Sequence, residues 1–204
     1  MTEEPTSETR SSLNAEDWAR AALDMVAEQG ADAVAVEPLA RSLGVTKGSF
    51  YWHFPNREAL LIAAQELWEK TETEDVLARA AKEPDPKVRI KRAFAGARAD
   101  RRASRMYLAW AQAGASDPVI DRGVRRVSER RLAFLIESYM LLGLDEKAAR
   151  DWAILAYSVF LGILHVRGDM PEVLPEGPDY QAYVGFLNDR LIPDMPTTPN
   201  ARIA

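Results

Sequence analysis

The sequence predicts an all-α protein of about nine helices, in which a three-helix N-terminal domain is followed by a larger helical domain. Apolar residues recur at three- and four-residue intervals along most of the chain. Asparagine, aspartate and proline mark helix starts, and glycine marks helix ends. No segment shows the alternation of a strand, and no internal repeat is visible. At 204 residues the chain is long enough to bury a core in one or two domains.

Residues 38–43 are predicted to form the first of two short helices. Pro38 is tolerated in a first helical turn, where its missing N–H is no loss. Leu39 and Leu43 are one turn apart and are expected to face inward. Gly44 suits the left-handed conformation that ends a helix, so a tight turn should follow.

The second short helix is expected to begin after Thr46, a good N-cap, and to end at Phe54, where Pro55 disfavours helix. Val45 and Phe50 have the spacing of a hydrophobic staple. Two turns are too few for a helix to be stable alone, so its aromatic rings must hold it from behind. The outer face then carries Lys47, Gly48, Ser49, Tyr51, Trp52 and His53. Such a helix-turn-helix fits a DNA major groove, and the alternative is an ordinary helical hairpin.

Segment 14–62 resembles the DNA-binding domain of TetR-type (tetracycline-repressor-like) bacterial transcriptional repressors. The match is strongest over Leu39-Ala40-Arg41-Ser42-Leu43-Gly44-Val45 and Gly48-Ser49-Phe50-Tyr51-Trp52-His53-Phe54-Pro55-Asn56-Arg57. The resemblance implies a first helix over 14–29 closed by Gly30. It also implies a homodimer that represses a palindromic operator and is released by a small-molecule effector.

The resemblance also implies a set of DNA contacts: Thr46, Lys47, Gly48, Ser49, Tyr51, Trp52, His53 and Arg57. The basic and phenolic side chains suit phosphates, whereas Ser49 and Trp52 suit base edges or thymine methyl groups. Gly48 permits close approach of the helix to DNA. The family often has Ser or Thr where the preceding helix begins, but this chain has Val36 and Glu37, so a phosphate contact is not expected there.

The net charge of −5 contrasts with the basic character expected of a DNA-binding protein. The first 55 residues carry nine acidic side chains against four basic ones. Between residues 38 and 57, however, there is no acid, and Arg41, Lys47 and Arg57 are present. Charges beyond about 8 Å are largely screened at physiological salt, so this face can be locally positive. Few bases are available, so non-specific DNA binding should be weak.

Other functions lack the residues they need. The chain has no cysteine, and His53 and His165 are too few and too distant for a metal site, so neither metal nor cofactor is expected. Residues 44–49 lack the order of a phosphate loop, and no catalytic motif occurs, so we expect no enzyme. Residues 1–10 do not form a signal peptide, and the apolar run 152–164 is too short to span a bilayer. A cytoplasmic protein without a membrane partner is expected.

The remaining helices are predicted from the capping residues, prolines and glycines at their ends. They cover 56–71, a helix opened by Asp85 and Pro86, one that ends at Gly114, then 117–142, 145–166 and 179–191, with a loop over 168–178. The family would break the chain near 100–105, although no proline or glycine marks it. The expected organisation is a flexible tail (1–13), a DNA-binding domain (14–57), an effector-binding and dimerisation domain (58–192) and a disordered tail (193–204).

The helix over 145–166 is apolar on nearly every side from Trp152 to Leu164. A helix of this kind must be covered all round, which indicates a partner on the face that the chain's own core leaves bare. A homodimer through this helix and the last one (179–191) is therefore expected. The alternative is a central helix inside a monomer.

Arg131 projects from the apolar side of the helix over 117–142. A buried unpaired guanidinium is costly, so Arg131 needs an internal salt bridge, a route to water, or an acidic effector to anchor. Large aromatic residues recur on the same helices and would either fill the core or line a ligand cavity. The candidate ligand-binding set is Trp68, Phe94, Tyr107, Trp110, Arg131, Trp152 and Tyr157.

Together these features predict a homodimeric, ligand-responsive transcriptional repressor. Its expected partners are a double-stranded DNA operator and a small apolar or weakly acidic effector. The alternative is a helical small-molecule-binding or scaffold protein whose helix-turn-helix is structural only.

Overall fold

The computed structural model describes residues 13–94 and 101–194, and in these ranges it contains helices and no strand, as the sequence predicts. Its α-helices are α1 (Ala15–Gln29), α2 (Val36–Ser42), α3 (Lys47–Phe50), α4 (Arg57–Glu69), α5 (Asp75–Ala81), α6 (Pro86–Ala93), α8 (Arg101–Gly114), α9 (Pro118–Leu141), α10 (Glu146–Asp169) and α11 (Gly177–Leu191). A π-helical segment, η2 (Lys70–Glu74), joins α4 to α5. Short 3-10 turns, η1 (Ala31–Ala33) and η3 (Pro171–Val173), follow α1 and α10.

Five of the ten described α-helices begin at a side-chain cap, as the sequence indicates for each of them. Asn14 and Asp17 form a reciprocal capping box at α1. The side chains that cap α4, α6, α9 and α10 are those of Asn56, Asp85, Asp117 and Asp145. Gly44 adopts the predicted left-handed conformation, with φ of 69°.

Several boundaries differ from the prediction. α2 begins at Val36, two residues before Pro38, because proline is accommodated anywhere in the first turn. α4 does not end at Thr71 but continues through η2 into α5, since no helix breaker stands before Pro84. α10 extends to Asp169 and α11 begins at Gly177, so each is longer than predicted.

Parts of three predictions lie outside the described residues. These are nearly all of the two tails (1–13 and 193–204) and residue 100 of the break expected near 100–105, beyond which α8 begins at Arg101.

The N-terminal helices pack around two aromatic side chains. Trp18 of α1 and Phe50 of α3 are completely buried, and their rings meet edge to face with centroids 5.4 Å apart. Phe54 stacks on Phe50 at 5.8 Å. Phe50 therefore fastens the short α3 to α1, and the rings of Phe50 and Phe54 point inward as predicted.

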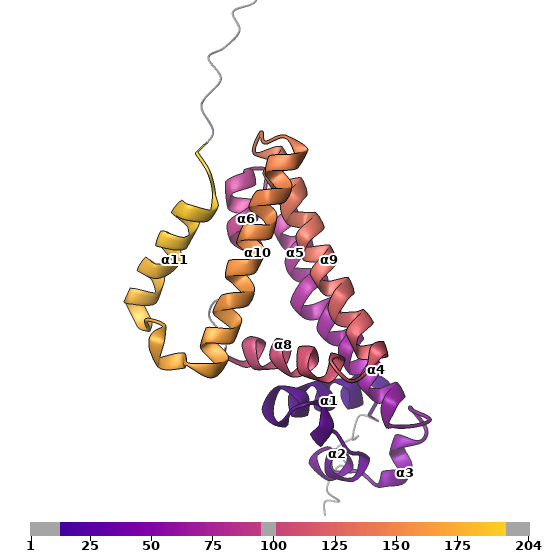
Figure 1. Ribbon diagram of the computed structural model, residues 1–204. Coiled ribbons are helices and arrows are strands. Elements are labelled where there is room, and N and C mark those ends of the chain that lie inside the picture. Colours follow the sequence, from indigo (N-terminus) through magenta and orange to yellow (C-terminus); the bar gives the residue numbers. More distant parts are fainter. Residues whose placement is uncertain (1–12, 95–100, 195–204) are drawn as a thin grey trace, which may run out of the picture.

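The larger part of the chain is built on three long helical segments (Figure 1). α4, η2 and α5 form one rod that runs beside α9, and α10 also packs along α9. α8 lies across the end of this bundle and contacts α1. An ion pair between Asp24 of α1 and Arg102 of α8 also joins the N-terminal helices to the bundle.

α11 stands at one side of the bundle and covers α10 only in part (Figure 1). It is tied in where Leu187 and Leu191 join the core and where Tyr139 Oη donates a hydrogen bond to the Leu191 carbonyl oxygen at 2.5 Å. Among the described helices, α10 alone is long and apolar enough to cross a membrane by length and composition. Part of this apolar surface is exposed in the structure, at Ile154 and Leu155.

Candidate functional site

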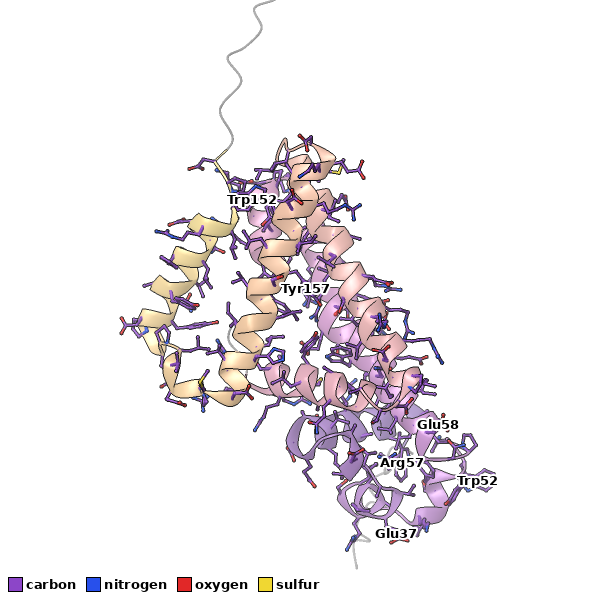
Figure 2. All side chains as sticks on the ribbon, viewed as in Figure 1. Glu37, Trp52, Arg57, Glu58, Trp152 and Tyr157 are labelled. Atoms are coloured by element: carbon purple, nitrogen blue, oxygen red, sulfur yellow. The ribbon has the colours of Figure 1, made fainter. Side chains whose placement is uncertain are left out.

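The α3 segment presents its side chains outward from the end of the molecule furthest from the bundle (Figures 1 and 2). α3 ends at Phe50 and turns through His53, so it is shorter than predicted. Thr46 holds the extended N-cap backbone, but its hydroxyl makes no capping hydrogen bond. Trp52 is 86% exposed and Tyr51 57% exposed. Two large rings held in water at this position are costly to leave bare and suit a surface that meets a partner.

Lys47, the first residue of α3, is not a free cation. Its Nζ lies 2.9 Å from Glu37 Oε1, in an ion pair between α3 and α2 (Figure 2 shows Glu37 at this end). The hydrogen bond and the opposite charge raise the pKa of Lys47 and lower the pKa of Glu37. The Glu37 carboxylate therefore competes with any phosphate for Lys47.

Arg57, the first residue of α4, is turned toward its own domain. Its Nε donates to the Val34 carbonyl oxygen at 2.5 Å, and its Nη2 donates to the Ala31 carbonyl oxygen at 2.7 Å. These carbonyl groups belong to the first residue of the η1 turn, Ala31, and to the residue that follows the turn, Val34. Arg57 thus joins α4 to the connection between α1 and α2, a role that sequence reasoning missed because the partners lie more than 20 residues away.

Arg131 lies inside the bundle, where its guanidinium is enclosed although its stem is half-buried. Thr73 Oγ1 accepts hydrogen bonds from Nε at 3.2 Å and from Nη2 at 2.9 Å, and the Glu72 carbonyl oxygen accepts one from Nη2 at 3.1 Å. Burial lowers the pKa of Arg131, and the nearby Tyr157 and Tyr107 oppose that shift. Among the described residues no carboxylate lies within ion-pair distance, so the predicted internal salt bridge is absent there.

Five of the seven predicted ligand-binding residues are brought together around two small cavities. Trp68, Tyr107 and Arg131 line one of about 30 Å³, and Phe94, Arg131 and Tyr157 line another of about 10 Å³. Burial raises the pKa of Tyr107 to about 12. Both cavities are far smaller than the roughly 300–1,000 Å³ of an open ligand site.

The other two predicted residues lie elsewhere. Trp110 is completely buried behind Trp68, with ring centroids 6.2 Å apart, and does not line either cavity. Trp152 packs on Tyr139 at 6.3 Å, near the end of α10 that is far from α8 (Figure 2). Both are core residues, because an aromatic ring on an inward face fills the core unless packing leaves a gap beside it.

Phe160 and the π-helical residues Glu72 and Thr73 line the Arg131 cavity and were not predicted. In the sequence Phe160 is one apolar residue among many on its helix, and no sequence signal marks a π-helix.

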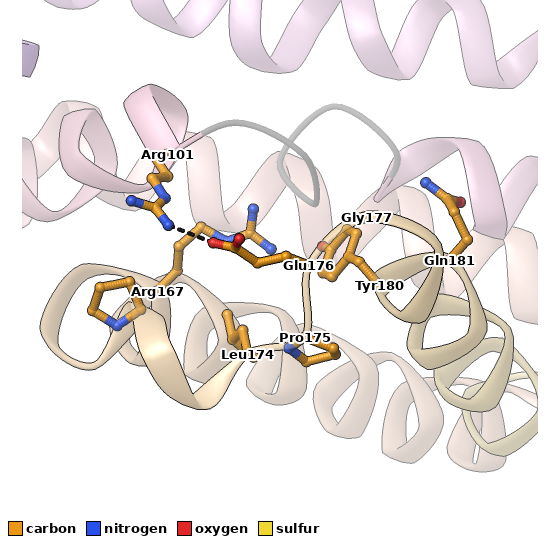
Figure 3. Close-up of a pocket in the computed structure, with 9 residues that line it drawn as sticks. Arg101, Arg167, Leu174, Pro175, Glu176, Gly177, Tyr180 and Gln181 are labelled. Atoms are coloured by element: carbon orange, nitrogen blue, oxygen red, sulfur yellow. Dashed lines mark hydrogen bonds and ion pairs between the residues drawn. The ribbon is translucent and has the colours of Figure 1, made fainter.

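A larger cavity of about 300 Å³ lies where α8, α10 and α11 meet. Figure 3 shows its polar lining, in which Arg101 pairs with Glu176 at 2.9 Å. Part of the lining of this cavity comes from the segment 168–178, which the sequence predicts to be a loop.

Metal binding receives no support from the described part of the chain. This part contains no cluster of His, Cys, Asp or Glu that could hold a metal ion. His53 lies with the α3 turn and His165 on α10, where its Nδ1 is 2.9 Å from the Leu161 carbonyl oxygen.

A short, aromatic-anchored second helix after a glycine turn has the arrangement of a helix-turn-helix, and here it is carried on a separate helical bundle. Residues 19–64 match the family described as bacterial regulatory proteins, tetR family. The tetracycline repressor protein class A from transposon 1721 of Escherichia coli is 49% identical over 47 residues, which are 23% of this chain and 22% of that protein. The match thus spans about a fifth of that relative. Residues 19–64 are therefore similar to the N-terminal segment of TetR-family regulators.

Solved structures extend the likeness beyond the N-terminal domain, in fold alone. A TetR transcriptional regulator from Legionella pneumophila has a TM-score of 0.75 and 17% identity, and the match covers 91% of this chain and all (100%) of that one. A putative transcriptional regulator from Saccharomonospora viridis, solved in complex with choline, has a TM-score of 0.71 and 17% identity over 86% of this chain and 93% of that one.

Proposed function

We propose that this protein is a homodimeric, ligand-responsive repressor that binds a palindromic operator and is released by a small-molecule effector. The observation that carries the proposal is the α3 surface. Its exposed residues lie inside the segment 19–64 that matches the tetR family of bacterial regulatory proteins. A cytoplasmic location fits this function.

The proposed DNA contacts are the residues that α3 and its flanking turns expose: Thr46, Lys47, Gly48, Ser49, Tyr51, Trp52 and His53. Lys47 must exchange Glu37 for a phosphate, so the ion pair acts as a modest barrier to non-specific binding. Trp52 is exposed enough to reach base edges or thymine methyl groups. We place Arg57 behind this surface, where its hydrogen bonds hold the start of α4.

The proposed dimer interface lies on α10 and α11. Ile154 and Leu155 of α10 are 50% and 48% exposed, and Phe186 of α11 is 49% exposed. The small residues Ser158 and Gly162 lie along the same exposed side of α10, where they would let a second helix approach closely. A partner here covers the apolar face that makes α10 resemble a membrane-spanning helix. Two α3 segments about 34–36 Å apart then read one operator.

The α4–η2–α5 rod supplies a mechanical link between the two proposed sites. It begins at Arg57 beside the DNA-binding helices and contains Thr73, which holds Arg131. An effector that fits only one position of this rod changes the spacing of the two α3 segments. A hundredfold loss of DNA affinity requires about 2.7 kcal/mol of coupling, and DNA must weaken the effector equally. With the proposed boundary between the DNA-binding domain (14–57) and the effector-binding and dimerisation domain (58–192), nearly all of this rod belongs to the second domain.

Two measurements test the proposal. Fluorescence anisotropy with the DNA upstream of the protein's own gene should show sequence-specific, salt-dependent binding, and the scaffold alternative predicts none. Sedimentation should show a dimer that Ile154→Asp disrupts, because the carboxylate loses its hydration in the interface. Leu141→Asp is the matched control, since Leu141 is also exposed but lies at the end of α9. A monomeric wild-type protein at micromolar concentration contradicts the dimer.

A further inference from the structure

We infer that the effector is an organic carboxylate with an apolar body, and that its carboxylate pairs with Arg131 in the cavity enclosed by η2, α8, α9 and α10. The inference rests on the proposed effector-responsive function and names the chemical class that the effector site takes. It starts from the charge of Arg131 and then follows the walls of the cavity.

Arg131 differs from Arg89, Arg126 and Arg130 in having no acidic partner among the described residues. Arg126 pairs with Glu69 at 3.0 Å, and Arg130 pairs with Glu74. Arg89, which is buried against the same helix, pairs with Glu137 at 2.9 Å. The fold therefore supplies carboxylates to three neighbouring guanidinium groups and leaves the enclosed one with neutral oxygens.

Neutral acceptors satisfy the hydrogen bonds of Arg131 but not its charge. Its partners are the Thr73 hydroxyl and the Glu72 carbonyl oxygen, and both belong to the π-helical turn η2. A guanidinium remains protonated at every physiological pH, so its charge stays in the cavity when the site is empty. Adding a carboxylate there supplies the missing countercharge and a bidentate acceptor.

The Phe160 side chain separates three small cavities that could hold the apolar body of the ligand. It lines the Arg131 cavity of about 30 Å³ and two adjoining cavities of about 10 Å³ each. Its ring lies under the Arg131 guanidinium, with Cζ 5.3 Å from the ring centroid, and it contacts Phe94 with centroids 5.5 Å apart. Phe160 is thus the shared wall of the three spaces, and the apolar body of a ligand occupies them together only if this ring turns aside.

The remaining charges favour an anion over a cation. A quaternary ammonium ligand would be repelled by Arg131, whereas Tyr107, which lines the same cavity, can donate a hydrogen bond to a carboxylate; the Tyr157 hydroxyl already donates to Ser128 Oγ at 3.0 Å. Glu72 lines the same cavity and lies near Arg131 without reaching ion-pair distance, so it opposes a bound anion. The larger cavity in Figure 3 is less suitable, because Arg101 is already paired with Glu176 and Arg167 lies over the Tyr180 ring at 4.9 Å.

Calorimetry and thermal shift on the full-length protein test the inference with octanoate and 3-phenylpropionate, each compared with its uncharged amide. We expect each acid to bind at least about tenfold more tightly than its amide, as a charge-assisted pair requires. Arg131→Met should abolish this preference and leave a folded protein, since removing a buried unpaired charge is not destabilising. Arg130→Met, the matched control on the same helix, should keep the preference. Glu72→Gln should strengthen acid binding several-fold.

Equal binding of acid and amide by the wild-type protein overturns the inference, as does failure of every compound to bind. Retention of the acid preference in Arg131→Met also overturns it. A Glu72→Gln protein that binds the acids no better and melts well below the wild type shows that Glu72 is the counter-ion, and that result overturns it too. Operator binding is measured separately, so loss of the carboxylate site leaves the proposed DNA-binding function standing.

Discussion

Replacing Arg57 by alanine separates an internal role for this residue from a contact with DNA. The structure gives it two short hydrogen bonds, to the carbonyl oxygens of Val34 and Ala31 at 2.5 Å and 2.7 Å. Hydrogen bonds from a charged donor contribute about 1.5–3 kcal/mol, and exposure of this side chain to water reduces that value. We therefore expect Arg57→Ala to lower the free energy of unfolding by about 1–2 kcal/mol.

The loss should appear in both stability and DNA binding. In a chain of this size, about 1 kcal/mol shifts Tm by roughly 2–4 °C, so Tm should fall by about 2–8 °C. Operator affinity should fall because the start of α4 is no longer held against the η1 turn. The slope of log affinity against log salt should stay unchanged, since no phosphate contact is removed. Circular dichroism melting and anisotropy at several salt concentrations measure these quantities.

Lys47→Ala is the control with the opposite pattern. Lys47 is exposed, so its loss should leave Tm nearly unchanged while the salt slope flattens by about one unit. If Arg57→Ala instead melts with the wild type and flattens the slope by about one unit, the internal role is refuted and Arg57 is a phosphate contact, as the family resemblance implies.

Three further predictions concern other parts of the molecule. Glu37→Gln frees Lys47 for phosphate and should strengthen non-specific DNA binding and steepen the salt slope by up to about one unit; an unchanged slope would show that the pair does not compete. Gly123→Ala places a methyl group against the buried Gln65 amide, whose Nε2 donates a hydrogen bond to the Ile120 carbonyl oxygen at 2.9 Å. Loss of this hydrogen bond should lower the free energy of unfolding by about 1–3 kcal/mol, and denaturant unfolding measures this change. Burial raises the pKa of Tyr107 from 10.0 to about 12, so the unfolded chain loses this proton first and stability should fall as pH rises from 10 to 12. Tyr107→Phe should make that fall shallower, and identical alkaline unfolding curves would contradict it.

The sequence by itself determined the local features of the fold. Helix starts at Asn14, Asn56 and Asp117 depend on a side chain and an N–H group only two or three residues apart, so their pattern is visible in the chain. The left-handed turn at Gly44 and the burial of Phe50 are local in the same sense. These residues were enough to predict the helix-turn-helix and the resemblance of this segment to TetR-family DNA-binding domains.

Only the tertiary structure decided what the charged and aromatic side chains do. Arg57 meets carbonyl groups 23 and 26 residues away, and Arg131 meets Thr73, 58 residues away. Trp68 lines a cavity while Trp110, buried beside it, does not, because that difference depends on how α8 packs against α9 and α10. Helical periodicity shows which face of a helix is buried, but the partner on that face comes from segments whose relative placement is set by packing of the whole core.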